Sequence, residues 1–153
     1  MDCALAPERL AFSRARGLAR LAGERRERTE QVRWIDVALG RWEAAAEDPA
    51  RCAGLRDELL LERADALRLA RELELVAAGY AELERGTGTV GALAALELGK
   101  LERRRGKRAD RARMQRSVER AQAEVSSADP GRLRARLSRD LSGLREALER
   151  ALE

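Results

Sequence analysis

The residues with the most obvious chemical potential are the basic side chains between Lys100 and Arg116. This segment holds nine Lys or Arg and two Asp or Glu residues, a local charge of +7, whereas the whole chain carries +4. The basic character therefore belongs to one segment and not to the whole surface. Because guanidinium groups pair with carboxylates and phosphates, we expect the segment to bind an anionic partner. The candidate residues are Lys100, Arg103, Arg104, Arg105, Lys107, Arg108, Arg111 and Arg113.

A glycine-rich motif, GTGTVG at 86–91, matches the spacing G-x-G-x-x-G of dinucleotide-binding loops. Such a loop requires a preceding strand, because the pyrophosphate binds where a parallel sheet leads into a helix. Here a segment with helical periodicity precedes the glycines, and the sequence predicts no strand. We interpret the glycines as a turn and expect no cofactor.

Other kinds of catalytic site are disfavoured by the absence of histidine. Ser-His-Asp and Cys-His arrangements and the Glu-x-x-His signature of di-iron bundles all require it. The carboxylates alternate with arginines at helical spacing, as in solvated ion pairs. Cys3 and Cys52 do not have the spacing of a metal or redox site. We therefore expect a protein that is not an enzyme and holds no metal.

Composition indicates a helical protein in a reducing compartment. Apolar residues make up 44%, charged residues 38% and aromatic residues 3% of the chain, which is rich in Ala, Leu, Arg and Glu. The N-terminus lacks a signal-peptide pattern. The longest weakly polar run, VGALAALELG, is too short to cross a bilayer and contains Glu97. With two cysteines in no particular spacing, the chain is expected to be cytoplasmic, without membrane insertion.

Three clusters of Gly, Pro and small polar residues predict turns near 48–54, 85–91 and 127–131. The four segments between and around them have helical periodicity. Apolar residues at steps of three and four run through 52–83, and a matching pattern runs through 18–42. Folding back at Asp48–Pro49 would make these two segments antiparallel. We predict a single all-α domain over 1–153, an antiparallel coiled-coil hairpin or elongated bundle of about four helical segments.

The third segment is expected to be one helix of about 35 residues. Its two ends are apolar, whereas the basic residues occupy the apolar positions in its middle, so this middle part cannot be held by leucine-type packing. Three interpretations stay open for it: solvation or neutralisation by Asp57, Glu58, Glu62 and Asp65, binding to an acidic protein surface, or binding to nucleic acid. Nucleic acid is the less favoured partner, because no aromatic residues are interleaved for stacking.

Two further features bear on partners. Trp34 lies off the apolar stripe of its segment, so it either anchors a partner or packs against a third helix. The last segment carries its own leucine stripe, which would serve internal packing or a homo-oligomer equally well.

Arginine-glutamate blocks occur at RLAGERRERTEQ (20–31) and LERRRGKRADRARMQRSVERAQAE (101–124). With the chain length and a hairpin turn near 85–91, they resemble the FliJ/YscO-type stalk proteins of flagellar and type III secretion export. The resemblance implies an antiparallel helical coiled coil that docks on an export ATPase or contacts chaperones, without catalysis of its own.

We therefore expect a non-enzymatic, cytoplasmic helical adaptor or stalk that acts through protein–protein contacts in protein transport. The alternative is a nucleic-acid-associated helical protein that binds phosphate through 100–116.

Overall fold

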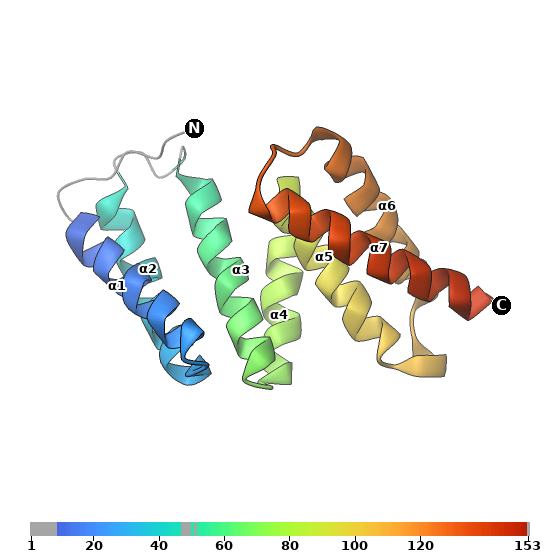
Figure 1. Cartoon of the computed structure of the whole chain (residues 1–153), viewed down its shortest axis with the longest axis horizontal. Coiled ribbons are helices and arrows are strands. Elements are labelled where there is room, and N and C mark those ends of the chain that lie inside the picture. Colours follow the sequence, from blue (N-terminus) through green and yellow to red (C-terminus); the bar gives the residue numbers. More distant parts are fainter. Residues whose placement is uncertain (1–8, 47–49, 51, 153) are drawn as a thin grey trace. The chain divides into compact units, whose positions relative to one another are not determined.

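The computed structural model describes residues 9–46, 50 and 52–152, and within them the fold is all-α, as predicted (Figure 1). It contains more helices than the expected four segments, so neither the coiled-coil hairpin nor the four-segment bundle is confirmed. The elements are α1 (Arg9–Glu24), α2 (Arg28–Ala45), α3 (Ala53–Leu69), α4 (Leu73–Glu84), α5 (Gly88–Arg103), the short 3-10 helix η1 (Gly106–Arg108), α6 (Arg111–Ser127) and α7 (Arg132–Leu152).

The predicted turns lie where the glycine and proline clusters place them. α4 ends at Glu84 and α5 begins at Gly88, and α6 ends at Ser127 before α7 begins at Arg132. The turn near 48–54 falls between α2 and α3, although Asp48–Pro49 lies outside the described residues.

Three further breaks, at 25–27, 70–72 and 104–110, produce the additional helices. Arg26 and Arg71 adopt φ values of 62° and 64°, the left-handed conformation that commonly ends a helix and that glycine usually supplies. The third break divides the expected helix of about 35 residues, so that prediction is wrong: α5 ends at Arg103 and α6 begins at Arg111.

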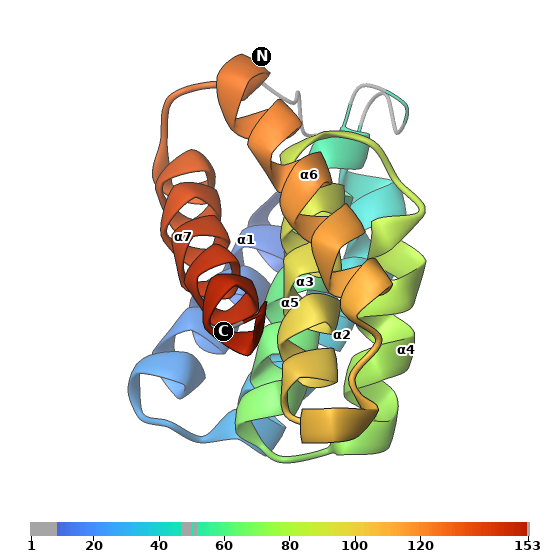
Figure 2. The same cartoon turned by 90° about the vertical axis from the view of Figure 1, so that its right-hand side faces the viewer.

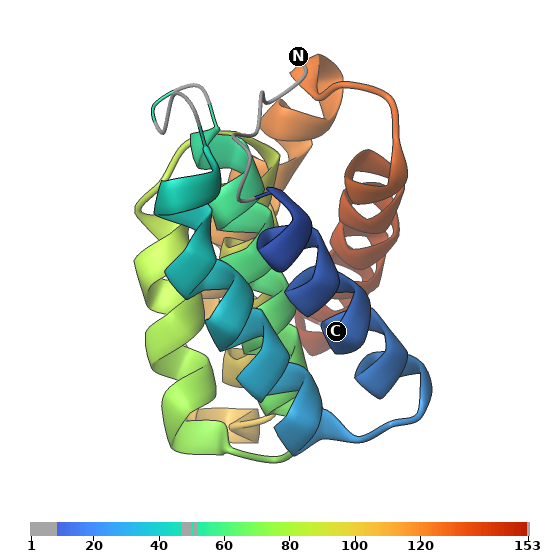
Figure 3. The ribbon, with the colours of Figure 1, turned by 90° about the vertical axis from the view of Figure 1, so that its left-hand side faces the viewer.

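The contacts within the chain fall into two compact units, Met1–Gly79 and Tyr80–Glu153, with the division inside α4. In the first unit α1 packs on α2 and α2 packs on α3, as Figure 3 shows for α1 and α2. Their shared core combines alanines with a few bulky side chains. Its buried residues are Phe12, Ala15, Ala19, Ile35, Ala38, Trp42, Ala46, Cys52 and Leu59. The prediction of one domain over 1–153 stays a prediction.

In the second unit α5, α6 and α7 each pack on the other two, which makes a closed three-helix bundle (Figure 2). All nine residues from Gly91 to Gly99 in α5 are buried. The run GALAALELG has small or apolar residues on nearly every side, as expected for a helix enclosed by protein. Among the described helices, none combines the length and the apolar character needed to cross a membrane.

The oxidation state of Cys52 differs from the reduced state that the sequence led us to expect. The residue is 2% exposed and disulfide-bonded. The other cysteine of the sequence, Cys3, lies outside the described residues. Because disulfides persist mainly in oxidising compartments, Cys52 does not support the reduced-compartment expectation.

Arg120 and Gly91 form a tight contact at the start of α5. The Arg120 guanidinium donates from Nη1 to the carbonyl of Glu84 at 2.6 Å, and from Nη2 to the carbonyl of Gly86. A Cβ on Gly91 would clash with that Gly86 oxygen and would lie 2.5 Å from Arg120 Nη2. The glycine therefore leaves room for an arginine that satisfies carbonyls at the end of α4.

Gly91→Ala is expected to destabilise the chain by about 1–3 kcal/mol, because backbone and the Arg120 cap must both shift. The matched control is Gly143→Ala in α7, where an added Cβ meets nothing within 4 Å. That change should raise stability by about 0.5–1 kcal/mol through helix propensity. Urea unfolding of both variants measures the contrast, and equal effects of the same sign would contradict this account.

Candidate functional site

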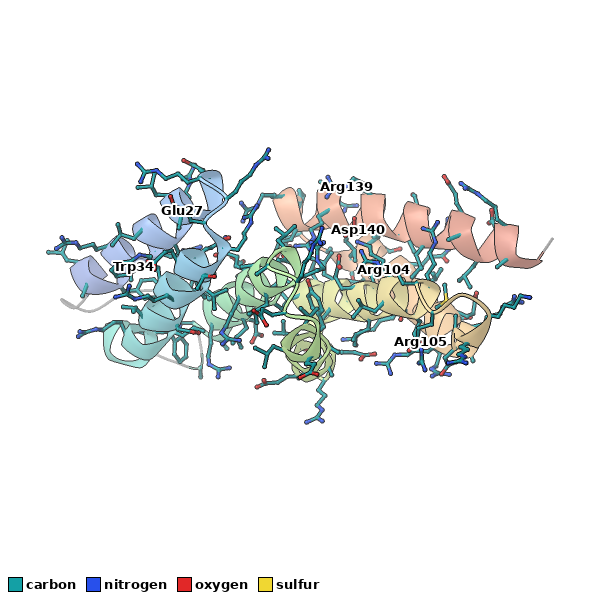
Figure 4. The ribbon with its side chains drawn as sticks, turned by 90° about the horizontal axis from the view of Figure 1, so that it is seen from below. Glu27, Trp34, Arg104, Arg105, Arg139 and Asp140 are labelled. Atoms are coloured by element: carbon teal, nitrogen blue, oxygen red, sulfur yellow. The ribbon has the colours of Figure 1, made fainter. Side chains whose placement is uncertain are left out.

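The basic residues lie on a turn between two helices. We call residues 103–111 the basic turn: it comprises the last residue of α5, the helix η1 and the first residue of α6. Gly106 has φ 61°, which a residue with a side chain rarely adopts, and this glycine lets the chain reverse. Figure 4 labels Arg104 and Arg105 of this turn.

Most cations of the basic turn point into solvent. All six are exposed, and five of them make no ion pair within the described part of the chain: Arg103, Arg104, Lys107, Arg108 and Arg111. The prediction that this segment stays outside the core is therefore confirmed for these five residues, although they do not lie on a continuous helix.

Two carboxylates hold the backbone of the basic turn. Glu102 accepts hydrogen bonds from Arg105 Nη1 at 3.0 Å and from the backbone N–H of Asp110 at 3.0 Å. Asp110 caps α6 by accepting from the N–H of Arg113 at 2.9 Å. The backbone hydrogen bond from Asp110 is the main cause that lowers the pKa of Glu102, and the Arg105 guanidinium lowers it further. The turn is thus fixed by its own acidic residues while its other cations remain free.

Three of the predicted partner-binding residues are paired inside the protein. Arg105 pairs with Glu102, and Arg113 Nη2 lies 3.1 Å from Glu84 Oε2. Lys100 lies within 3.0 Å of both Glu97 and Asp140. For these residues internal neutralisation applies, and the carboxylates that provide it belong to the second unit.

The contacts of Lys100 extend into a buried ionic cluster between α5 and α7. The Glu97 side chain is 4% exposed, and its Oε1 lies 2.6 Å from Lys100 Nζ and 3.4 Å from Arg136 Nη2. Asp140, labelled in Figure 4, is 12% exposed and accepts from the same two cations at 3.0 and 3.5 Å. The exposed Arg139 also pairs with Asp140, at 3.6 Å. Two carboxylates thus meet three cations, and Glu97, the most buried charge of the cluster, is paired as a buried charge requires.

Sequence reasoning missed this cluster, although a signal for it exists. Glu97 is the single charged residue in the run GALAALELG. A charge in a helix that is apolar all round must find partners, and α7 offers Arg136 and Asp140 at a spacing of four residues. Glu97, the single acidic residue in an apolar run, was therefore a better indicator of this cluster than the density of arginines.

Trp34 lies in the first unit, apart from the basic turn in the sequence. It is half-buried and packs against the core that α1 and α2 share, with the Arg33 guanidinium carbon 5.6 Å from its ring centroid. Packing within the fold therefore accounts for one side of its ring. Among the described residues, no group of three or more Cys, Asp or Glu could hold a metal ion.

Glu97→Ala is expected to lower the free energy of unfolding by about 3 kcal/mol, because it leaves the half-buried Lys100 and Arg136 with one carboxylate fewer. Glu146→Ala is the matched control: it removes a helical glutamate whose pair with Arg150 has side chains 62% and 71% exposed. That loss should stay below about 0.5 kcal/mol. Chemical denaturation measures both, and equal losses would show that the buried cluster has no special role.

Glu102→Gln should cost about 1 kcal/mol at pH 7, because two hydrogen bonds lose their charged acceptor. The pKa of Glu102 is lowered in the folded chain, so its stabilisation is complete above the ordinary value of 4.5 and is lost as the pH falls below it. The difference in unfolding free energy between the parent and the variant should therefore shrink from pH 5 to pH 3. A difference independent of pH would contradict the proposed role of the carboxylate.

Comparisons with known proteins do not add a family to this geometry. The chain matches no protein-family model, no curated protein and no solved structure. The side chains of the basic turn are therefore the evidence for the kind of partner that it binds.

Proposed function

We propose that the chain is a non-enzymatic helical adaptor whose basic turn binds an acidic surface of a protein partner. The observation that carries this proposal is the set of five exposed cations without an ion pair, on a turn whose backbone is held by Glu102 and Asp110. Surplus charge of one sign on a fixed backbone is a feature that steers and orients a partner of opposite charge.

Pre-organisation gives this turn an advantage over a flexible basic tail. The hydrogen bonds of Glu102 and Asp110 fix the backbone before binding, so less conformational entropy is lost when a partner docks. Four of the five free cations are arginines, which can form two parallel hydrogen bonds to a carboxylate. A cluster of Asp and Glu side chains on a protein surface is the matching chemistry.

Nucleic acid is the second candidate, because the same guanidinium groups also pair with phosphate. Aromatic side chains usually add base stacking at such surfaces. The only aromatic residue of the second unit is Tyr80, which is fully buried. Without a stacking platform the unit would depend on phosphate contacts alone, so we favour the acidic protein.

An export ATPase or a chaperone of a flagellar or type III export apparatus remains the most concrete partner that we propose, with the protein in the cytoplasm. The described helices have 12 to 21 residues, shorter than the helices of a long stalk. The proposal therefore depends on the basic turn and not on the length of the helices. A disulfide at Cys52 in cells would instead favour an oxidising compartment.

The quadruple variant Arg103→Gln, Arg104→Gln, Lys107→Gln and Arg108→Gln tests the proposal. It should weaken binding of a fluorescent polyglutamate peptide by roughly tenfold or more, about 1.4 kcal/mol, with little loss of stability, since these four residues make no ion pair with any residue that the structure describes. The control replaces four exposed arginines outside the turn, Arg25, Arg56, Arg85 and Arg132, and lowers the net charge equally. Fluorescence anisotropy measures both.

Equal weakening by the two quadruple variants would mean that net charge alone attracts the peptide, and it would overturn the site. A parallel salt titration with a random-sequence DNA duplex separates the two partner classes. Tight DNA binding that falls steeply with salt, together with no polyglutamate binding, would favour the nucleic-acid alternative.

A further inference from the structure

An apolar groove lies between α1 and α2. It encloses about 670 Å³ and is lined from α1 by Leu10, Arg14 and Leu18, and from α2 by Trp34, Val37 and Arg41. Leu10 is 81% exposed and Val37 is 37% exposed. Large apolar side chains that gather in a concave surface, and are not scattered singly, mark a binding surface.

Both helices have a second apolar face besides the one that forms the core. In α1 the core face carries Phe12 and Ala19, Leu10 and Leu18 lie on the groove side, and Ala15 belongs to both. Residues 10, 14 and 18 are four apart, and residues 34, 37 and 41 are three and four apart, so each set follows one helix face. An apolar stripe wider than one neighbour can cover is typical of a helix that packs against a further element.

The two units differ in how this further element is supplied. In the second unit α7 packs on both α5 and α6 and closes the bundle. In the first unit α3 packs on α2, but it has no comparable packing with α1 among the described elements. The pair α1 and α2 therefore lacks a third helix that packs on both of its members, as α7 packs on both α5 and α6.

The charges around the groove define the chemistry of what can fill it. Arg14 and Arg41 are exposed on its two sides, and neither makes an ion pair within the described residues. No described residue that lines the groove is acidic. An occupant must present apolar side chains to Leu10, Trp34 and Val37 and carboxylates to the two arginines.

We propose that this groove binds an acidic amphipathic helix of a partner protein. Its leucine-like side chains would enter between α1 and α2 at spacings of three and four residues, and its Glu or Asp side chains would pair with Arg14 and Arg41. This site goes beyond the proposed function, since it lies in the other unit from the basic turn and uses apolar burial. An adaptor needs two binding surfaces, and the groove supplies the second.

Trp34 gives the groove its anchor. One side of the ring packs on the core of the first unit and another lines the groove, so the ring is held in place before a partner arrives. Tryptophan in such a position commonly contributes more binding energy than its neighbours. The two interpretations of Trp34, core packing and partner anchor, are therefore compatible.

A pair of synthetic helices tests the proposal on the full chain. One peptide carries leucines at steps of three and four with glutamates elsewhere, and the other has lysines in place of the glutamates. We expect the glutamate peptide to bind at least roughly tenfold more tightly by fluorescence anisotropy, about 1.4 kcal/mol. Equal affinity for the two peptides, or no binding of either, would overturn the proposal.

Two double variants locate the binding. Leu10→Glu with Val37→Glu should reduce the affinity for the glutamate peptide by roughly tenfold or more, because both residues line the groove. The control is Leu69→Glu with Leu75→Glu, which adds the same two charges in place of large apolar residues at positions 49% and 54% exposed in the same unit. Equal effects of the two double variants would overturn the proposal.

Charge reversal supplies a test that does not depend on loss of function. Arg14→Glu with Arg41→Glu should shift the preference of the chain toward the lysine peptide, since the charges around the groove are then negative. An unchanged preference would contradict the proposed role of the two arginines.

Two other outcomes separate this site from its alternatives. If the quadruple variant of the basic turn abolishes binding of the glutamate peptide, the peptide binds that turn, and the groove proposal fails while the proposed function stands. If the chain sediments as a dimer that Leu10→Glu with Val37→Glu converts to a monomer, a second copy occupies the groove, and the proposal is again wrong.

Discussion

Placement of one concentrated run of positive charge, partly on carboxylates and partly in water, is the constraint on which the second unit depends. Like charges at this density oppose helix formation, because neighbours three and four residues apart repel one another. The structure accommodates these cations in two ways. Lys100 and Arg113 are drawn inward onto carboxylates of neighbouring helices, whereas Arg103, Arg104 and Arg108 are placed on a turn where they face water. The paired cations contribute to the stability of the unit, whereas the unpaired ones are those that we propose to bind a partner.

Helix type and several turns could be read from the sequence because they depend on local chemistry. Glycine and proline clusters mark the ends of α4 and α6, and apolar periodicity marks the helices. The breaks at Arg26 and Arg71 could not be read in this way, since arginine carries no turn signal and rarely adopts the left-handed conformation that both residues have. The apolar pattern of 18–42 did contain a hint, because Arg25 and Arg28 occupy two of its positions, next to the point where α1 ends and α2 begins.

The position of the basic segment could be read from the sequence, but which of its cations stay exposed and unpaired could not. Charge density placed it between Lys100 and Arg116, and the exposed residues there agree. Which cations remain free depends on carboxylates that are distant in sequence, such as Asp140 beside Lys100 and Glu84 beside Arg113. Such pairings follow from the tertiary arrangement, which composition and spacing do not encode. The groove between α1 and α2 was also missed, because 18–42 was predicted as one continuous helical segment and not as two helices with a surface between them.

The free cations of the basic turn can be observed directly by NMR of arginine side chains. Titration of the labelled chain with a polyglutamate peptide follows each guanidinium Nε–H signal separately. We predict saturable shifts at Arg103, Arg104, Arg108 and Arg111, and little change at Arg113, which is already paired with Glu84. Small, non-saturating shifts spread over arginines throughout the chain would contradict the claim that this turn is a pre-organised binding site.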